Sequence, residues 1–193
     1  MTTPEPTSGL AHHLLIAMPH LDDPGFDQTV TYVIEHSAEG AMGLTLNRPQ
    51  ALTIQRVFES MDIVPRVSVD PALHPVLSGG PVDPQTGFIL HPPCQQMWQS
   101  TVVLAPGLWL TTSRDVLAAI ACGQGPERSL IVLGYAGWDA GQLEQELAEN
   151  VWLTVPAPTQ NWVFEVPFPE RWHAAAHLLG VDLRLLSATA GHA

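Results

Sequence analysis

The stretch Gly40-Ala41-Met42-Gly43-Leu44-Thr45-Leu46-Asn47-Arg48-Pro49 decides the fold, because it predicts a strand with two unlike faces. Side chains alternate across a strand, so Met42, Leu44 and Leu46 share one bulky, apolar face. The opposite face is small, with Gly43 near its centre, and another backbone or a ligand can approach it closely. We therefore expect the bulky face to lie on a core and the small face to lie beneath a closely packed neighbour.

The end of this stretch predicts a defined corner. Asn47 tolerates turn geometry, and Pro49 pushes Arg48 toward an extended backbone. Residues 29–46 alternate in the same way on both sides of a short turn. They are predicted to form a β-hairpin.

The rest of the chain mixes strands and helices without the strict alternation of a doubly wound sheet. This pattern favours an α+β fold, in a single domain with a large mixed β-sheet and about four flanking helices. Residues 10–193 are predicted to form this domain, and residues 1–9, rich in Thr, Pro and Gly, a disordered tail. Helices are predicted near residues 54–61, 113–122, 140–149 and 170–179, and strands at 10–17, 87–91, 101–104, 108–112, 129–133, 151–155 and, as a short edge, 163–166.

The helix at 140–149 has a recognisable start. Asp139 and, three positions later, Gln142 have the form of a capping box, in which two side chains satisfy the first amide groups of a helix. Three glutamates of the same helix are predicted to face water: Glu144, Glu146 and Glu149.

The composition is acidic. The 193 residues include 19 Asp and Glu against seven basic residues, all of them Arg, for a net charge of −12. Nucleic-acid binders need a basic footprint and anionic lipids attract basic residues, so we expect neither direct nucleic-acid binding nor membrane association. A run of about 20 apolar residues, which a membrane-spanning helix needs, does not occur in the sequence.

The cysteines favour a cytoplasmic location. Cys94 and Cys122 are 28 positions apart, which is neither a CxxC motif nor a disulfide framework. The first basic residue is Arg48, which is too late for a secretory signal or an organellar transit peptide. Thiols remain reduced in the cytoplasm, so we expect the chain to reside there.

A series of short motifs lies in order along nearly the whole chain: HLLIAMP (13–19), DPGF (23–26), EH (35–36), GAMGLTLNRP (40–49), GGPV (79–82), YAGW (135–138), QLEQEL (142–147) and GHA (191–193). Taken together they resemble the YqgE/AlgH family of bacterial proteins. The resemblance implies an α+β fold with a large mixed sheet in one domain, and it brings no established biochemical activity. Some members of that family are labelled transcriptional regulators through a genetic association rather than a demonstrated DNA contact.

Several residues could carry chemistry, although none has a diagnostic spacing. Histidine and aspartate at 20–23, with His36 and His91, could ligate a metal, but no HExxH or zinc-knuckle spacing accompanies them. Cys94 lies three residues from His91, and a catalytic pair would depend on their geometry in space. The glycine pairs match neither G-x-G-x-x-G nor a Walker A loop, which needs a lysine. No catalytic residue, metal or cofactor is therefore predicted.

Polar residues of the motifs lie in turns or at strand ends, where binding sites tend to occur. We predict that five of them surround one depression: Asp23, His36, Asn47, Arg48 and Gly80. His36 and Asn47 are about ten residues apart on the hairpin, or roughly 30 Å along a straight strand. A shared depression therefore requires a bent sheet, and otherwise the end that holds Asp23, Asn47 and Arg48 is the better candidate.

Three classes of function follow from these patterns. The first is a non-catalytic binding or regulatory module for a small molecule or a protein, since no recognisable catalytic set is present. The second is an enzyme that uses Asp22, Asp23, His36 or His91 in acid–base or metal chemistry. The third is direct DNA binding, which only the family label suggests.

Overall fold

A computed structural model describes residues 9–21 and 23–183 of the chain. Its centre is a nine-stranded sheet, in which eight strands follow the order β6-β7-β5-β8-β3-β2-β1-β9 and β4 pairs with β8. Every pairing is antiparallel except that of β4 with β8, so the predicted mixed sheet is confirmed. The strands are β1 (His13–Ala17), β2 (Val30–Ser37), β3 (Gly40–Thr45), β4 (Val76–Ser78), β5 (Val82–His91), β6 (Val102–Ala105), β7 (Leu108–Thr111), β8 (Leu130–Asp139) and β9 (Trp152–Pro156).

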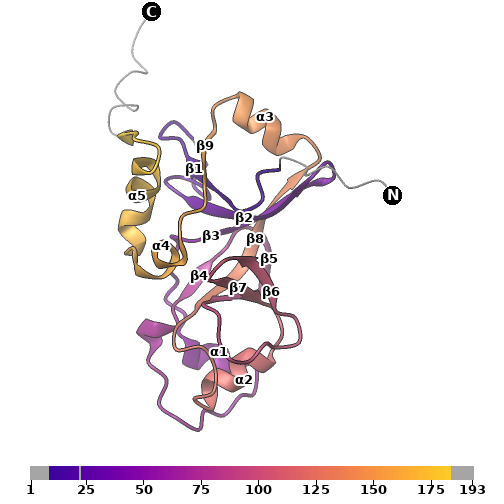
Figure 1. The fold of residues 1–193 in the computed structure, drawn as a ribbon, viewed down its shortest axis with the longest axis vertical. Helices are drawn as coiled ribbons and strands as arrows, with labels where there is room; N and C mark the ends of the chain where they lie inside the picture. The colour runs from indigo at the N-terminus through magenta and orange to yellow at the C-terminus, as the bar shows by residue number, and fades with distance from the viewer. Residues whose placement is uncertain (1–8, 22, 184–193) are drawn as a thin grey trace, which may run out of the picture.

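Short helices cover both faces of this sheet, and the predicted α+β class is confirmed. α4 (Gln160–Glu165) and α5 (Arg171–His177) pack on one face, where apolar residues from β1 to β8 form the largest core. On the opposite face, α1 (Ile54–Ser60) and α2 (Asp115–Ala121) cover one end. α3 (Gln142–Ala148) covers the other end of that face, as Figure 1 shows. One continuous sheet thus supports three apolar clusters.

The hairpin of β2 and β3 forms as predicted. The two strands pair from Thr31 with Thr45 to Ser37 with Gly40, with a bulge after Val33. Leu44 of β3 and Leu46, just beyond its end, are buried in the largest core.

The small face of β3 lies under a closely packed neighbour. Gly43 is buried, and a methyl group added there would lie 2.7 Å from Thr31 Cγ2 and 3.4 Å from the Trp138 ring. The bare face of the strand is therefore filled by side chains of β2 and β8 rather than open to a ligand.

Strand β8 is longer than its sequence indicated. The predicted strand stops at Leu133, whereas β8 continues through Gly134 to Asp139. Gly134 has a φ of 72°, and the register with β5 shifts beside it, so it acts as a bulge. The bulge turns Ala136 and Trp138 onto the face covered by α3, so that β8 joins both ends of the sheet.

The predicted edge strand at 163–166 is wrong, because residues 163–165 belong to α4 and Val166 is the C-cap of that helix. A short apolar run does not distinguish a strand from a buried helix. Arg171, which is 1% exposed, donates hydrogen bonds to the carbonyls of Val163 (2.6 Å), Val166 (3.0 Å) and Leu46 (2.6 Å). It thereby satisfies carbonyl groups at the end of α4 and ties that helix to the end of β3, while burial lowers the pKa of its guanidinium to about 10.

The other helix predictions are confirmed with small shifts in their bounds, but the predicted capping box differs. The residue that precedes α3 is Gly141, with a φ of 76° and no side-chain cap. Gln142 Oε1 accepts a hydrogen bond of 3.0 Å from the Asp139 amide, which supplies half of the expected arrangement.

None of the helices in residues 9–21 and 23–183 is both long and apolar enough to cross a bilayer. Residues 1–8 of the predicted tail and the GHA motif at 191–193 lie outside the described residues.

Candidate functional site

Asn47 and Arg48, two of the five predicted site residues, hold the loop that precedes β2. Asn47 Oδ1 accepts from the Val30 amide at 2.9 Å, and its Nδ2 donates to the Gln28 carbonyl at 2.8 Å. The Arg48 guanidinium donates to the carbonyl of Asp27. The Asn47 amide is therefore engaged on both sides by the chain itself.

Asp23 organises the same loop. Its Oδ1 accepts from the Gly25 amide at 2.8 Å, which is an Asx turn. Its carbonyl accepts from the amides of Phe26 and Asp27. The structure therefore brings Asp23, Asn47 and Arg48 together around one loop, whereas Asp22 lies outside the described residues.

Gly80 allows a close approach between backbones. Its φ is 154°, and a Cβ at this position would collide with the backbone of Tyr135 in β8. The preceding Gly79 carbonyl accepts from Thr45 at 2.9 Å, so this reversal adjoins the end of β3. Dense backbone packing explains the glycine at position 80.

His36 lies at the turn end of the hairpin, at the opposite end of β2 from the loop that Asp23, Asn47 and Arg48 share. Its Nδ1 accepts from the Leu10 amide at 2.9 Å, so Nε2 carries the proton and donates to Glu144 Oε1 at 2.8 Å. His36 is six residues beyond Val30, or roughly 20 Å along a strand. The structure therefore separates His36 from the Asp23 loop, and the binding role of the five residues remains a prediction.

His91 and Cys94 are close in space, but their hydrogen bonds do not form a catalytic pair. His91 Nδ1 must donate to the Pro92 carbonyl at 2.8 Å, and Nε2 accepts from Thr111 Oγ1 at 2.9 Å. The Cys94 sulfur lies 3.7 Å from the protonated Nδ1. Burial lowers the pKa of His91 and raises that of Cys94, so both groups are neutral at pH 7. In this tautomer His91 has no basic nitrogen directed at the thiol.

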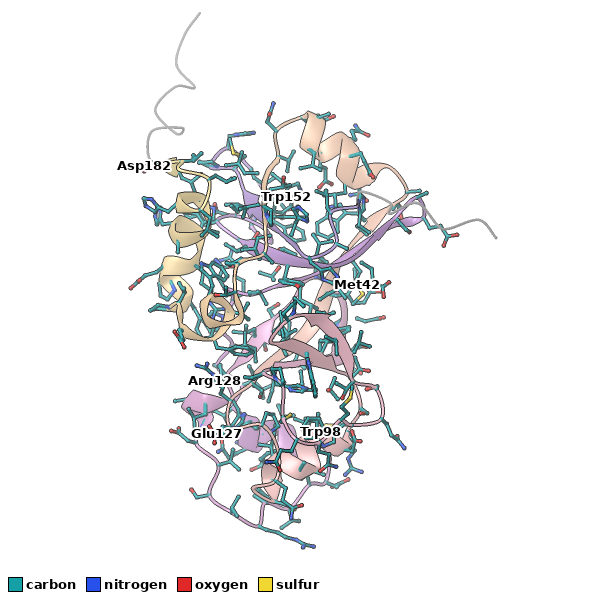
Figure 2. All side chains as sticks on the ribbon, in the orientation of Figure 1. Met42, Trp98, Glu127, Arg128, Trp152 and Asp182 are labelled. Carbon is teal, nitrogen blue, oxygen red and sulfur yellow. The ribbon has the colours of Figure 1, made fainter. Side chains whose placement is uncertain are left out.

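Glu146 is a polar centre that the sequence did not reveal, and its predicted exposure to water is wrong. Its Oε2 accepts from the indole nitrogens of Trp138 at 2.8 Å and Trp152 at 2.7 Å, and its Oε1 accepts from Gln142 at 2.8 Å. Trp152 lies below α3 in Figure 2. The hydrogen bond between Glu146 and Trp138 joins the YAGW and QLEQEL motifs. Of the three donors to the Glu146 carboxylate, only Gln142 lies at a helical spacing, four residues before Glu146, from which the sequence could indicate a contact.

A cleft of about 470 Å³ lies between α1 and α2, over the face of β5 and β8 that those helices cover. Apolar side chains form most of its wall, and a few hydroxyl and amide groups and one guanidinium complete it. The lining residues are Leu52, Val57, Ser60, Met61, Pro84, Gln85, Gly87, Ile89, Thr112, Ser113, Arg114, Leu117, Ile131 and Leu133.

Gly87 leaves room on the floor of this cleft. It pairs with Leu133 across β5 and β8, and a Cβ added there would have only Leu133 Cδ2 as a neighbour, at 3.8 Å. Most described glycines inside the strands, such as Gly43 and Gly134, are instead crowded by neighbouring atoms. The cleft therefore owes part of its depth to a missing side chain.

No group of three or more His, Cys, Asp or Glu side chains within the described part of the chain is placed to hold a metal. The cleft lining contains none of these four residue types. Its chemistry is therefore that of an apolar pocket with a small number of hydrogen-bonding groups, the usual composition of a small-molecule site.

Comparisons with known proteins agree on one family. The family model described as AlgH-like matches residues 14–184. A UPF0301 protein of Alcanivorax borkumensis is 53% identical over 186 residues, covering 96% of this chain and 97% of its own. A UPF0301 protein of Pseudomonas aeruginosa is also 53% identical over 186 residues, covering 95% and 96%.

Two solved structures share the fold. The solution structure of the AlgH protein from Pseudomonas aeruginosa has a TM-score of 0.75 and 51% identity, with complete coverage of both chains. A crystal structure of a Corynebacterium diphtheriae protein has a TM-score of 0.69 at 20% identity, covering 97% of this chain and 94% of its own, and this likeness concerns the fold alone.

Proposed function

The chain belongs to the AlgH-like family, and from this premise we propose that it is a non-catalytic binding or regulatory module whose ligand is a small molecule held in the cleft between α1 and α2. We expect it to act in the cytoplasm, because Cys94 and Cys122 are both free thiols and a reducing compartment keeps them so.

The observation that carries this proposal is the open floor at Gly87. An apolar cleft wall that no side chain covers leaves apolar surface exposed to water, so a chain that only needed stability would gain by covering it. At Gly87 an added Cβ meets no atom closer than 3.8 Å, and the backbone does not require glycine through a positive φ. A mainly apolar cleft of about 470 Å³ lies within the size range of sites for small molecules.

The groups in the cleft favour binding over catalysis. A nucleophile needs an adjacent base, and general acid–base catalysis needs a titratable group matched to the working pH. The hydroxyl groups that line the cleft are those of Ser60, Thr112 and Ser113. Ser60 donates to the Val57 carbonyl and Ser113 to Asp115, so both protons are already engaged within the chain.

Filling the cleft tests this proposal. Gly87→Val places a branched side chain on the cleft floor in a strand, where such residues are favoured. We expect the wild-type protein to bind the neutral fluorophore prodan, with a blue-shifted emission, and Gly87→Val to lose that binding while it remains folded by circular dichroism.

Gly137→Val is the matched control. Gly137 is an exposed strand glycine outside the cleft, and a Cβ there would make only ordinary contacts, the closest at 3.5 Å from the Tyr135 ring. Binding of prodan that is equal in the wild type and both variants, or absent from the wild type, would reject the cleft as the site.

A further inference from the structure

We propose that the ligand of this cleft carries a single carboxylate or equivalent monoanionic group, bound by Arg114 at the cleft mouth, and an apolar body packed on the floor around Gly87. This inference rests on the proposed function, since it assigns a chemical class to the ligand of the same cleft.

The charge of the lining carries the first step. Arg114 is the single charged residue among those that line the cleft. The chain as a whole has 19 acidic residues against seven arginines, so an average surface of this protein is negative. A cleft whose one charge is positive is complementary to a monoanion, and it would leave a ligand cation without a counter-charge.

Acidic residues are absent from the cleft lining itself, although Glu59, Asp62, Asp83 and Asp115 each adjoin a lining residue in sequence. Between Asp83 and Arg114, 30 consecutive residues contain no Asp, Glu, Lys or Arg. This uncharged segment includes most of β5, which supplies Gly87 and Ile89 to the cleft floor. The floor of the cleft therefore carries no carboxylate, whereas Asp62 and Asp115 line a neighbouring hollow together with Arg114.

Asp115, the acid nearest to Arg114 in sequence, is already engaged. Its Oδ2 accepts from the Gln99 amide at 3.0 Å, and its Oδ1 accepts from the Val116 amide at 3.0 Å and from the Ser113 hydroxyl. It does not line the cleft. The Arg114 guanidinium is thus not paired with this carboxylate.

Arg114 is anchored across the cleft mouth. It immediately precedes α2, and its guanidinium donates to the carbonyl of Met61, at the end of α1. A guanidinium has five N–H donors, so one such bond fixes the group and leaves further donors for a planar carboxylate. Its position between the two helices would hold the head group at the rim.

The apolar body of the ligand would lie below this head group. Leu117 comes from α2, and Ile131 and Leu133 come from β8, so the interior wall is aliphatic. A straight-chain or small-ring acid therefore matches the cleft better than a sugar or a nucleotide, whose many polar groups would lose hydrogen bonds to water on entry.

Three probes of equal chain length separate charge from apolar burial: octanoate, octanol and octylamine. By isothermal titration calorimetry at low salt we expect octanoate to bind at least about tenfold tighter than octanol, the effect of one charge-assisted hydrogen bond. Octylamine should bind more weakly than octanol. In Arg114→Gln the affinity for octanoate should fall to that for octanol, with octanol unchanged, whereas Gly87→Val should weaken both.

Arg56→Gln is the charge-matched control, since Arg56 is an exposed arginine of α1 that pairs with Glu59 at 2.7 Å and does not line the cleft. It should keep the preference for octanoate. Equal binding of octanoate and octanol, a preference for octylamine, or a preference that survives in Arg114→Gln would overturn the assignment of a monoanion while leaving the cleft as a binding site. A wild-type protein that binds none of the probes would instead refute the proposed function, and this inference with it.

Discussion

Replacing Gly43 by valine should destabilise the fold, because the small face of β3 is fully occupied. A Cβ at Gly43 would lie 2.7 Å from Thr31 Cγ2 and 3.0 Å from the Tyr32 carbonyl oxygen. The Thr31 side chain cannot move away easily, since Thr31 is 0% exposed and its hydroxyl group is hydrogen-bonded to that of Thr45 at 3.0 Å. Rotating the β-branched Thr31 to make room would break this buried hydrogen bond.

The size of the effect follows from these contacts. Overpacking of a dense core costs about 1–3 kcal/mol, and valine, with two methyl groups beyond Cβ, should lie toward the upper end. In a domain of this length each kcal/mol lowers the Tm by about 2–4 °C. Gly43→Ala, which adds the Cβ alone, should cost about 1 kcal/mol.

Urea denaturation of a double-mutant cycle provides the assay. Thr31→Ser removes the methyl group that the new Cβ would meet and keeps the hydroxyl group bound to Thr45. The free energy of unfolding of Gly43→Ala combined with Thr31→Ser should therefore exceed the additive value by about 0.5–1 kcal/mol. An additive cycle, or an unchanged Tm for Gly43→Val, would refute the reasoning that this face is closed by β2.

Glu146→Gln should lower the free energy of unfolding by about 1–3 kcal/mol and change tryptophan fluorescence, because two indole donors, Trp138 and Trp152, lose a charged acceptor. A variant with wild-type stability in urea would show that the carboxylate is dispensable. Burial raises the pKa of Tyr32 to about 12 from an ordinary value near 10, so the folded state retains a proton that the unfolded state loses between these pH values. The wild type should therefore lose about 1.4 kcal/mol of stability per pH unit relative to Tyr32→Phe in that window, and parallel pH–stability curves would contradict this. No sequence-specific DNA binding is expected at physiological salt, since a chain at −12 is repelled by phosphates. A salt-resistant gel shift with one promoter sequence and not with scrambled DNA would contradict it.

Periodicity along the chain predicted the hairpin and the two faces of β3 correctly. Leu44 and Leu46 lie in the largest core, and Gly43 lies where a small residue is required. Four helices also formed close to their predicted positions. These features are encoded by side chains only a few residues apart, so a local pattern is sufficient to predict them.

Long-range contacts decided the features that the periodicity missed. Residues 163–165 belong to a helix, and Arg171 caps the end of that helix while also holding the distant Leu46 carbonyl. Strand β8 continues beyond Leu133, because Gly134 forms a bulge against β5 instead of ending the strand. In both cases residues distant in sequence settle a local choice between conformations.

The site shows the same division between sequence and tertiary structure. The sequence by itself determined the family, the α+β class, and the corner at Asn47 and Arg48 that Pro49 fixes. Only the tertiary structure decided that the side chains of these residues bind their own loop, and that a cleft opens elsewhere over Gly87. The physical reason is that a turn depends on neighbouring residues, whereas a cleft is bounded by side chains from α1, α2, β5 and β8, and these meet only after the helices have packed on the sheet.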